Sequence, residues 1–389
     1  MPVCSARARS LILPPFDVIN HRAAVLRQQG KDVISLGQAV PGLPPPPAAL
    51  AAARASLSNP DVHRYAADAG LPTLRDALCA ALAREFAADV TADEVIVTAG
   101  GNQAFMLAVM TVVDPGDEVV VPGPYFVNHE MAIRAAGAVP VEAALDESAG
   151  FRARWRDIAP HITPRTRAVV VCSPSNPTGA VTSGDDLADI VRELAARRIV
   201  LLFDETYMHF VFDGVHVPPT SLPAWRDTSV VVGTFSKSFA MTGWRVGYLI
   251  GSPDVVAQAI KIQDAMIICA PVVSQVAVEA AIREDWNYAR AFDPELRSRR
   301  EALGAGLARI PGVSWAPAGG GFFAFVRTSH ERDSEKLASA ILESVHVVTI
   351  PGRAFGESGE GHLRLSYGAV SVDVLTEACD RLGRFFAHR

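Results

Sequence analysis

The sequence lacks the features that mark secreted, zinc-binding and membrane-spanning proteins. It has five cysteines, an odd number, and no two of them form a C-x-x-C pair. Neither a disulfide framework nor a metal site is therefore expected, and a reducing cytoplasm is the predicted location. The amino-terminal residues contain no apolar run long enough for a signal peptide, and no uncharged apolar run reaches the roughly 18 residues of a membrane span.

The sequence also lacks a basic patch. Its 36 lysines and arginines are outnumbered by 42 aspartates and glutamates, which gives a net charge of −6 spread along the chain. Proteins that bind nucleic acids or membrane surfaces usually carry concentrated positive charge, so neither partner is expected. The glycine run at 319–321 lacks the strand–G-x-G-x-x-G–helix context of a dinucleotide site, and we reject that interpretation.

Short β-branched runs alternate with longer helical stretches rich in alanine, leucine and arginine. The expected strands are 94–98, 117–121, 168–172, 199–203 and 229–233, and the expected helices are 103–113, 128–136 and 185–196. This order predicts an α/β fold with a mostly parallel central sheet flanked by helices. The strands are nearly uninterrupted apolar runs, as in sheets buried on both faces. Ligands are then expected at the loops that follow the strands.

The length of 389 residues predicts two domains. Residues 48–285, which contain the alternating strands and helices, are assigned to a large ligand-binding domain. Residues 1–47 and 286–389 are assigned to a smaller α+β domain that is built from both ends of the chain.

Three of the loops after strands carry polar residues that suit a bound anion or ring. Gly100 and Gly101 separate a strand from a helix, where backbone N–H groups hold phosphates, although many ordinary turns contain glycine. Asn176, in Asn-Pro-Thr-Gly, either belongs to a tight turn or donates to a ligand oxygen. Asp204, directly after an apolar strand, either caps a helix or pairs with a protonated ring nitrogen.

The most specific string is residues 234–248, which begins Thr-Phe-Ser-Lys-Ser. Lys237 follows a strand and two hydroxyl residues, and Arg245 lies eight residues later. A desolvated, cationic setting lowers the pKa of a lysine and makes it a nucleophile, and arginine with hydroxyl groups suits a phosphate. Arg364 interrupts an alternating apolar strand, so it either faces solvent or forks a substrate carboxylate.

Together these strings resemble the class I/II aminotransferases, which are fold-type I pyridoxal-phosphate (PLP) enzymes. The matching motifs are Ser-Lys-x-Phe-x-Met-Thr-Gly-Trp-Arg-Val-Gly-Tyr at 236–248, Asn-Pro-Thr-Gly at 176–179 and Asp-Glu-x-Tyr at 204–207. The similarity extends from about residue 14 to the carboxyl terminus. It implies that residues 48–285 form a large PLP-binding domain of the fold-type I PLP-transferase type.

The resemblance implies a role for each of these positions. Lys237 corresponds to the lysine that holds PLP as a Schiff base, and Asp204 to the partner of the ring nitrogen, which keeps the ring an electron sink. Lys237, Asp204 and Tyr207 are the implied catalytic residues. The other implied cofactor contacts are Asn176 and Tyr207 at the phenolic oxygen, Tyr125 on the ring face, and Gly100, Gly101, Asn102, Thr234, Ser236 and Arg245 at the phosphate.

The resemblance also implies a substrate site and a partner chain. Arg364 resembles the arginine that binds the substrate carboxylate, helped by Asn176 and the backbone of Gly37. Tyr65 resembles a tyrosine that reaches the phosphate of a neighbouring subunit, and such sites lie between subunits. A homodimer with shared active sites is therefore implied.

The implied function is transfer of an amino group from an L-amino acid to a 2-oxo acid. Lys237 would abstract the α-proton of the donor and return it to the cofactor. The sequence departs from aspartate-using relatives at two places: Asn102 stands where they often carry lysine, and residues 266–271 are apolar where many place an arginine. We therefore expect a donor with a non-acidic, neutral or aromatic, side chain.

Two other interpretations stay open. The chain could be a PLP-dependent lyase, cyclase or oxidase of specialised metabolism on the same fold, because His21 or His129 could act as a second proton carrier; the plainer interpretation is that both are solvated or structural. A PLP-sensing regulator would need an added DNA-binding domain, for which the chain has no spare length or basic helix.

Overall fold

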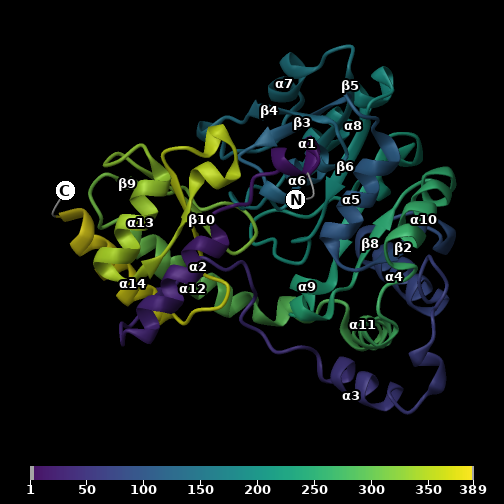
Figure 1. Ribbon diagram of the computed structural model, residues 1–389, viewed down its shortest axis with the longest axis horizontal. Helices are drawn as coiled ribbons and strands as arrows, with labels where there is room; N and C mark the ends of the chain where they lie inside the picture. The colour runs from purple at the N-terminus through teal and green to yellow at the C-terminus, as the bar shows by residue number, and fades with distance from the viewer. Residues whose placement is uncertain (1–3, 388–389) are drawn as a thin grey trace.

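The structure is a computed structural model, and it describes residues 4–387. The chain forms two halves with separate sheets and separate apolar cores (Figure 1). The larger half holds a seven-stranded sheet, and the smaller half holds a four-stranded and a two-stranded sheet. None of the helices within residues 4–387 is both long enough and apolar enough to cross a bilayer.

The seven-stranded sheet is mostly parallel, as the sequence predicts. Its strands, in spatial order, are β2 (Val95–Thr98), β8 (Gly247–Ile250), β7 (Ser229–Thr234), β6 (Val200–Asp204), β5 (Thr166–Cys172), β3 (Glu118–Gly123) and β4 (Val139–Ala144). β8 runs antiparallel to both of its neighbours, and the other four pairings are parallel. The antiparallel β8 and the edge strand β4 were not among the strands expected from the sequence.

Helices cover both faces of this sheet. Neighbouring residues of one strand, such as Ile96 and Val97, belong to different apolar clusters, because successive side chains point to opposite faces. The helices whose residues join the Ile96 cluster are α5 (Gly101–Val112), α6 (Val127–Ala135) and α10 (Pro253–Ile267). Those joining the Val97 cluster are α3 (Pro47–Ser56), α4 (Pro72–Phe86), α7 (Trp155–Ile158), α8 (Gly184–Arg197), α9 (Phe235–Ser238) and α11 (Val272–Asp285). Burial on both faces explains why the strands are continuous runs of valine, isoleucine and leucine.

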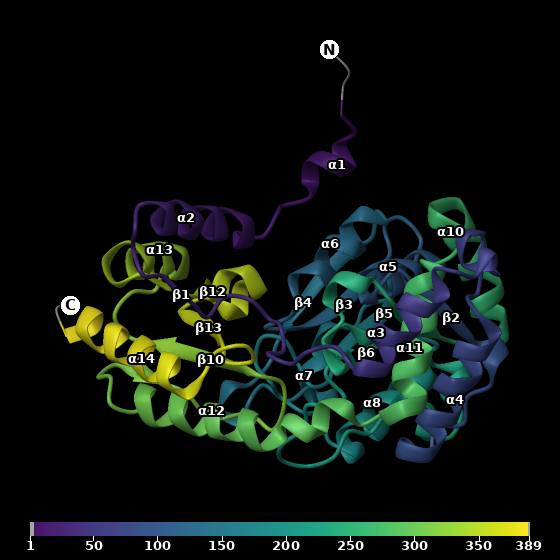
Figure 2. The same cartoon turned by 90° about the horizontal axis from the view of Figure 1, so that it is seen from below.

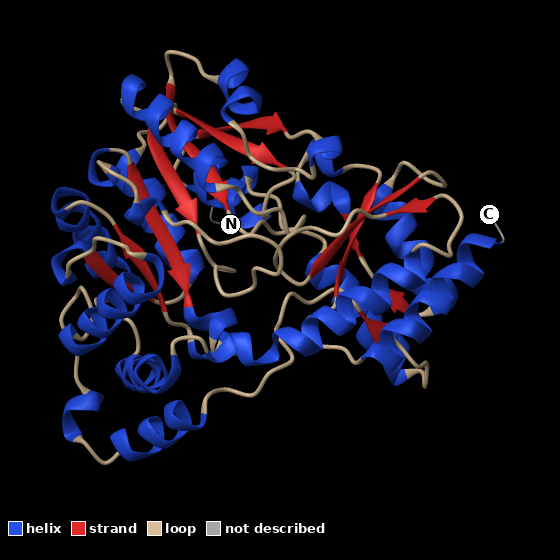
Figure 3. Ribbon diagram, turned by 180° about the vertical axis from the view of Figure 1, so that it is seen from behind, coloured by secondary structure: helices blue, strands red, loops and turns tan. Residues whose placement is uncertain are grey.

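The smaller half is an antiparallel sheet packed against helices. Its strands, in spatial order, are β12 (Ile350–Pro351), β13 (His362–Ser366), β10 (Phe323–Thr328) and β9 (Val313–Ser314). Its long helices are α12 (Asp293–Leu307), α13 (Ser334–Val345) and α14 (Val372–Ala387), and their apolar side chains form one cluster with β10 and β13. Figure 3 shows the two groups of strands well apart, with loops of both halves meeting between them.

The N-terminal segment joins the smaller half before the chain enters the larger one. α2 (Phe16–Gln28) lies beside α13 (Figure 2), where Arg22 forms an ion pair with Glu343 at 2.5 Å. β1 (Ile34–Ser35) pairs in parallel with β11 (Val347–Val348). The short α1 (Ala6–Ser10) instead contacts α6 of the larger half. The predicted boundaries after residues 47 and 285 fall at the start of α3 and the end of α11, and the division into domains stays a prediction.

Candidate active site

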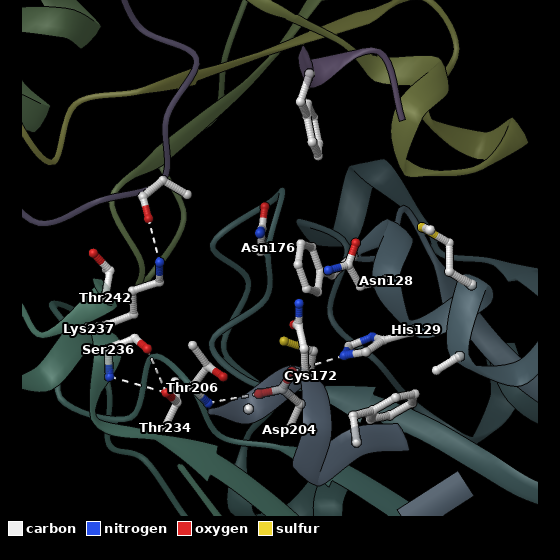
Figure 4. Close-up of a pocket in the computed structure, with 18 of the residues that line it drawn as sticks. Asn128, His129, Cys172, Asn176, Asp204, Thr206, Thr234, Ser236, Lys237 and Thr242 are labelled. Atoms are coloured by element: carbon white, nitrogen blue, oxygen red, sulfur yellow. Dashed lines mark hydrogen bonds and ion pairs between the residues drawn. The ribbon is translucent and has the colours of Figure 1, made fainter. Parts of the chain in front are cut away.

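A cavity of about 640 Å³ lies between the two halves. It opens at the carboxyl ends of β5, β6 and β7, where the sequence predicts ligands. Its other walls come from the N-terminal segment, from α5 and α6, and from β13. Figure 4 shows the polar side chains of this cavity converging from these separate elements.

Lys237 reaches the cavity from α9, a single turn that directly follows β7. Its Nζ donates a hydrogen bond to the carbonyl oxygen of Ala39 at 2.6 Å, across the space between the halves (Figure 4). Burial, together with the positive charges of Arg364 and Arg245, lowers the pKa of Lys237 to about 8. At pH 7 about one-tenth of this amine is therefore uncharged, and about half at pH 8, and the uncharged form is the one that acts as a nucleophile or a proton acceptor.

Asp204 ends β6 and lies buried at the floor of the cavity. Its Oδ1 accepts from the backbone N–H of Thr206 at 2.9 Å, and its Oδ2 lies 2.9 Å from Nε2 of His129. Burial acts to raise the pKa of this carboxyl, but the hydrogen bonds and the charge of His129 outweigh it and hold the pKa below its ordinary value. The side chain is therefore a carboxylate that can hold a second proton donor in the cavity.

The contact between His129 and Asp204 is one that the sequence did not reveal. His129 comes from α6, and its ring is tilted against Phe105 at 4.2 Å and meets Phe126 edge-on at 5.5 Å. Its Nδ1 is buried and has no partner among the described residues. The pair joins positions 75 residues apart, so only the relative placement of two elements could have shown it.

The predicted phosphate contacts gather at the start of α5. Gly100 has φ of 88°, a conformation that favours glycine, and a Cβ at this position would collide with the guanidinium of Arg245. Arg245 is held by the carbonyl oxygen of Thr242 at 2.8 Å. The hydroxyl of Thr234 lies 2.8 Å from that of Ser236 and accepts from its backbone N–H. Of the predicted phosphate contacts, those that line the cavity are Gly101, Asn102, Thr234, Ser236 and Arg245.

Arg364 is buried on β13, so the alternative of an exposed strand face is wrong. It donates to Oδ1 of Asn176 at 2.9 Å and to the carbonyl oxygen of Gly37 at 2.6 Å, which brings the three predicted substrate residues together. Burial lowers the pKa of Arg364 to about 10, and its Nε has no partner within residues 4–387. Three aromatic rings lie within 6 Å of the guanidinium carbon: Phe16, Phe323 and Phe355.

The two tyrosines predicted to contact the cofactor differ in whether they line the cavity. Tyr207 lines the cavity, and burial raises the pKa of its hydroxyl above the ordinary value. Tyr125 is not among the lining residues; its hydroxyl donates to Glu130 at 2.8 Å. The neighbouring Phe126 lines the cavity instead. Phe126, which immediately precedes α6, therefore lies on the cavity wall where the sequence predicted Tyr125.

Two predicted residues lie away from the cavity. Tyr65 follows the larger half's first helices and is 79% exposed, with no described neighbour that would explain an aromatic side chain there. His21 is exposed on α2 and does not line the cavity, although Asn20 beside it does. Nothing in the structure therefore places His21 where it could carry a proton.

The residues of the cavity fit the cofactor that the resemblance implies. A buried amine of lowered pKa, a buried carboxylate and a glycine turn before a 12-residue helix face one space. A PLP group needs a lysine, an acidic partner for its ring and a phosphate cradle, and these groups supply all three.

The chain matches known proteins over nearly its whole length. Residues 31–382 match the family model described as aminotransferase class I and II. An aspartate aminotransferase of Streptomyces avermitilis is 35% identical, over 98% of this chain and 96% of that protein.

Solved structures give the same picture of the fold. The aspartate aminotransferase of Thermus thermophilus with maleate superposes with a TM-score of 0.93 at 33% identity, covering 99% of this chain and all of that one. An alanine aminotransferase from Pyrococcus furiosus superposes with a TM-score of 0.94 at 30% identity, covering 100% of both chains. The similar proteins thus share one fold and differ in the amino acid that their names give.

Proposed function

The chain belongs to the class I and II aminotransferases and is a PLP-dependent aminotransferase; from that premise we propose that it takes amino groups from amino acids with neutral side chains, at a site shared by two subunits. The amino acid and the 2-oxo acid are its substrates. The single observation that supports a neutral donor is which lysine and arginine side chains line the cavity.

We assign the cofactor to the space between Lys237 and Asp204. The phosphate would lie at the start of α5, held by Gly101, Ser236 and Arg245, and the ring would lie against Phe126. Bound there, PLP supplies an electron sink for the electron pair left when the α-hydrogen departs. Asp204 would keep a proton on the ring nitrogen, because His129 and Thr206 hold its carboxylate in the charged form.

Lys237 would carry the proton. Its Nζ lies in the cavity on a flexible stem, and with a pKa of about 8 it both accepts and releases a proton near neutral pH. The donor's carboxylate would bind the free Nε of Arg364 and share its outer nitrogens, as the fork geometry of arginine allows. The phenyl rings around Arg364 exclude water and strengthen that pairing.

The side chain of the donor meets a surface without a spare cation. Within residues 4–387, the lysine and arginine side chains that line the cavity are Lys237, Arg245 and Arg364, and each has a task already. Beside the groups assigned to the cofactor, the wall that remains for the donor side chain carries apolar or neutral amide groups, among them Leu11, Phe16, Asn20, Met106, Phe126, Asn128 and Met131. A second carboxylate would lose its hydration there without an ion pair in return.

The dimer accounts for exposed apolar side chains on the larger half. Tyr65 is 79% exposed, Leu57 57% and Met266 42%. A second subunit would cover them and bring its own Tyr65 to the phosphate.

The five cysteines are free thiols in the structure, which suits the reducing cytoplasm expected for this chain.

The test is a donor screen without an acceptor. The PLP-loaded protein is mixed with alanine, leucine, phenylalanine, aspartate or glutamate, and the cofactor spectrum and the 2-oxo acid are followed. We expect neutral donors to convert the cofactor at least about 10-fold more efficiently than acidic ones, since an unpaired charge costs at least one factor of ten. Aspartate as the best donor would overturn the neutral assignment, and a product other than the 2-oxo acid would overturn transamination.

The shared site has its own test. Sedimentation should give twice the mass of one chain, and Tyr65→Phe should weaken PLP binding while leaving the dimer intact, because only one hydroxyl is lost. A monomer that transaminates at the full rate would refute the shared site without affecting the donor assignment.

A further inference from the structure

A buried histidine lies directly beneath the helical turn that carries Lys237. The Nδ1 of His209 lies 2.7 Å from the hydroxyl oxygen of Ser238, the residue after Lys237. His209 and Ser238 are each 1% exposed. Neither side chain lines the cavity, and the proposed transamination uses neither of them.

The turn needs an anchor because it is too short to hold itself. α9 has four residues, and an isolated turn of that length is unstable without tertiary contacts. Successive residues of a helix point about 100° apart, so Lys237 faces the cavity while Ser238 faces the interior. The stacked rings of Phe235 and Phe239, whose centroids are 5.9 Å apart, pack against each other at the turn. Such an apolar contact does not fix the orientation of the turn as a hydrogen bond does.

The histidine belongs to the chain segment that carries the other cofactor groups. His209 follows Tyr207 by two residues and Asp204 by five. Its ring also meets that of Trp286, the residue that follows α11, edge-on at 4.8 Å. The contact with Ser238 therefore joins the loop after β6 to the helical turn α9 beneath the cavity.

The ring is neutral in this position. Burial, followed by the charges of Arg290 and His216, lowers the pKa of His209 to about 3. A neutral imidazole has one donor and one acceptor nitrogen, and a serine hydroxyl can complement either one. The bond thus survives across the pH range in which the enzyme would work.

We propose that His209 is a positioning residue: its hydrogen bond to Ser238 fixes the turn from which Lys237 reaches the cavity. The inference rests on the proposed role of Lys237 as the cofactor lysine. The buried hydrogen bond would thereby orient the amine of Lys237 and keep water away from it.

The variants remove the bond from either side. His209→Phe keeps a ring of similar size, Ser238→Ala is the smaller change, and the double variant removes both partners. We expect each single variant to lower kcat by about 10- to 100-fold, because misplacement of a reacting group by about 1 Å has that effect, with the donor KM changed less than about twofold. The double variant should be no worse than the single ones, since both remove one interaction. His209→Asn, whose amide can reach the same hydroxyl, should restore most of kcat.

A second readout needs no cofactor. Lys237 is one of only four lysines in the sequence, so its acylation by an amine reagent can be followed by peptide mapping of the cofactor-free protein at several pH values. The midpoint should rise from about 8 toward the ordinary lysine value in His209→Phe, because a loosened turn admits water to the amine.

His216→Phe is the matched control. His216 is also buried, lies 3.3 Å from Glu205, and has ring contacts with Phe86 and Phe203, which lie outside α9. It should lower the melting temperature but leave kcat and the Lys237 midpoint unchanged. Unchanged kcat and midpoint in both His209→Phe and Ser238→Ala would overturn the inference, as would equal shifts in His216→Phe. Lys237→Ala is diagnosed separately: a cofactor absorption that persists in that variant would overturn the lysine assignment whatever His209 does.

Discussion

The cavity has two buried charges, and they are satisfied in different ways. Asp204 sits on the larger half and is paired with His129 and the backbone of Thr206, which together hold its pKa below the ordinary value. Arg364 sits on the smaller half and bonds only to neutral oxygens, and burial lowers its pKa to about 10. Folding stabilises the charge of Asp204 and opposes the charge of Arg364.

The charge of Asp204 is thus balanced by partners within the protein, whereas Arg364 bonds only to neutral oxygens among the described residues. A carboxylate that carries its own partners is part of the permanent floor of the site. A guanidinium with an unpartnered Nε among three aromatic rings has its binding capacity still free. With the proposed roles, the cofactor end would be preorganised, and the substrate end would carry a charge that a bound carboxylate neutralises.

The largest effect should come from Asp204→Asn. It removes the charge that would hold the ring nitrogen protonated, and the loss of one such electrostatic contact lowers kcat by about 10²- to 10³-fold. The donor KM should change little, because the substrate carboxylate binds at the other end. Steady-state kinetics with saturating PLP check this, and a loss confined to KM would contradict the division of the two ends.

A smaller effect, on binding, should come from Arg364→Lys. The charge stays, but the fork that engages two carboxylate oxygens is lost, so we expect KM for every donor to rise about 10- to 100-fold. The rise should be the same for alanine and phenylalanine, since the contact is with the part they share. Donor-dependent changes would show that Arg364 instead faces the side chain.

Removing the charge of Asp204 or of Arg364 should also change the free energy of unfolding in different directions. Asp204→Leu removes a satisfied charge and leaves His129 unpaired, so the free energy of unfolding should fall by about 2–4 kcal/mol. Arg364→Leu removes a charge that folding opposes, and should leave that free energy unchanged or raise it by about 1 kcal/mol. Urea unfolding of the cofactor-free proteins at pH 7 gives both values, and equal losses would abolish the contrast.

The smallest effect is a shift in the titration of Lys237, which both ends influence. Burial and the two arginines lower its pKa, while Asp204 acts to raise it. In cofactor-free protein, the acylation midpoint of about 8 should therefore rise in Arg364→Leu and fall in Asp204→Asn. Shifts of the same sign in both variants would mean that burial alone controls the amine.

The wild-type titration has a consequence for stability. Because the folded pKa of Lys237 lies below its unfolded value, the unfolded chain binds more protons between the two. The Lys237 contribution therefore opposes folding fully below pH 8 and is relieved as the pH rises toward 10. Lys237→Met should flatten that part of the profile in urea unfolding.

Residues in contiguous motifs were predictable, and residues that meet only across the fold were not. Lys237 and Asp204 follow apolar strands, and the ends of parallel strands meet at one edge, so strand order alone brought them together. The residue that lines the cavity before α6 lies one position from the predicted Tyr125, because two adjacent aromatic side chains precede this helix and the sequence does not say which one faces the cavity.

The smaller half was the harder one to predict. The alternating pattern around Arg364 fits an exposed strand as well as a buried one. It is buried because β13 lies between β12 and β10 and both of its faces are covered, by rings and by the cavity wall. The contact of His209 with Ser238 likewise depends on how the loop after β6 packs against α9, which no local pattern encodes.

The hydrogen bonds that join the N-terminal segment to Lys237 and Arg364 connect residues that are synthesised at different times. Gly37 and Ala39, which accept hydrogen bonds from Arg364 and Lys237, leave the ribosome among the first parts of the chain. Arg364 lies 327 positions after Gly37. At a synthesis rate of about 5–20 residues per second, it is added to the chain roughly 16–65 seconds later. The residues assigned to the cofactor, the last of them Arg245, are therefore all synthesised before Arg364, without which the assigned substrate site is incomplete.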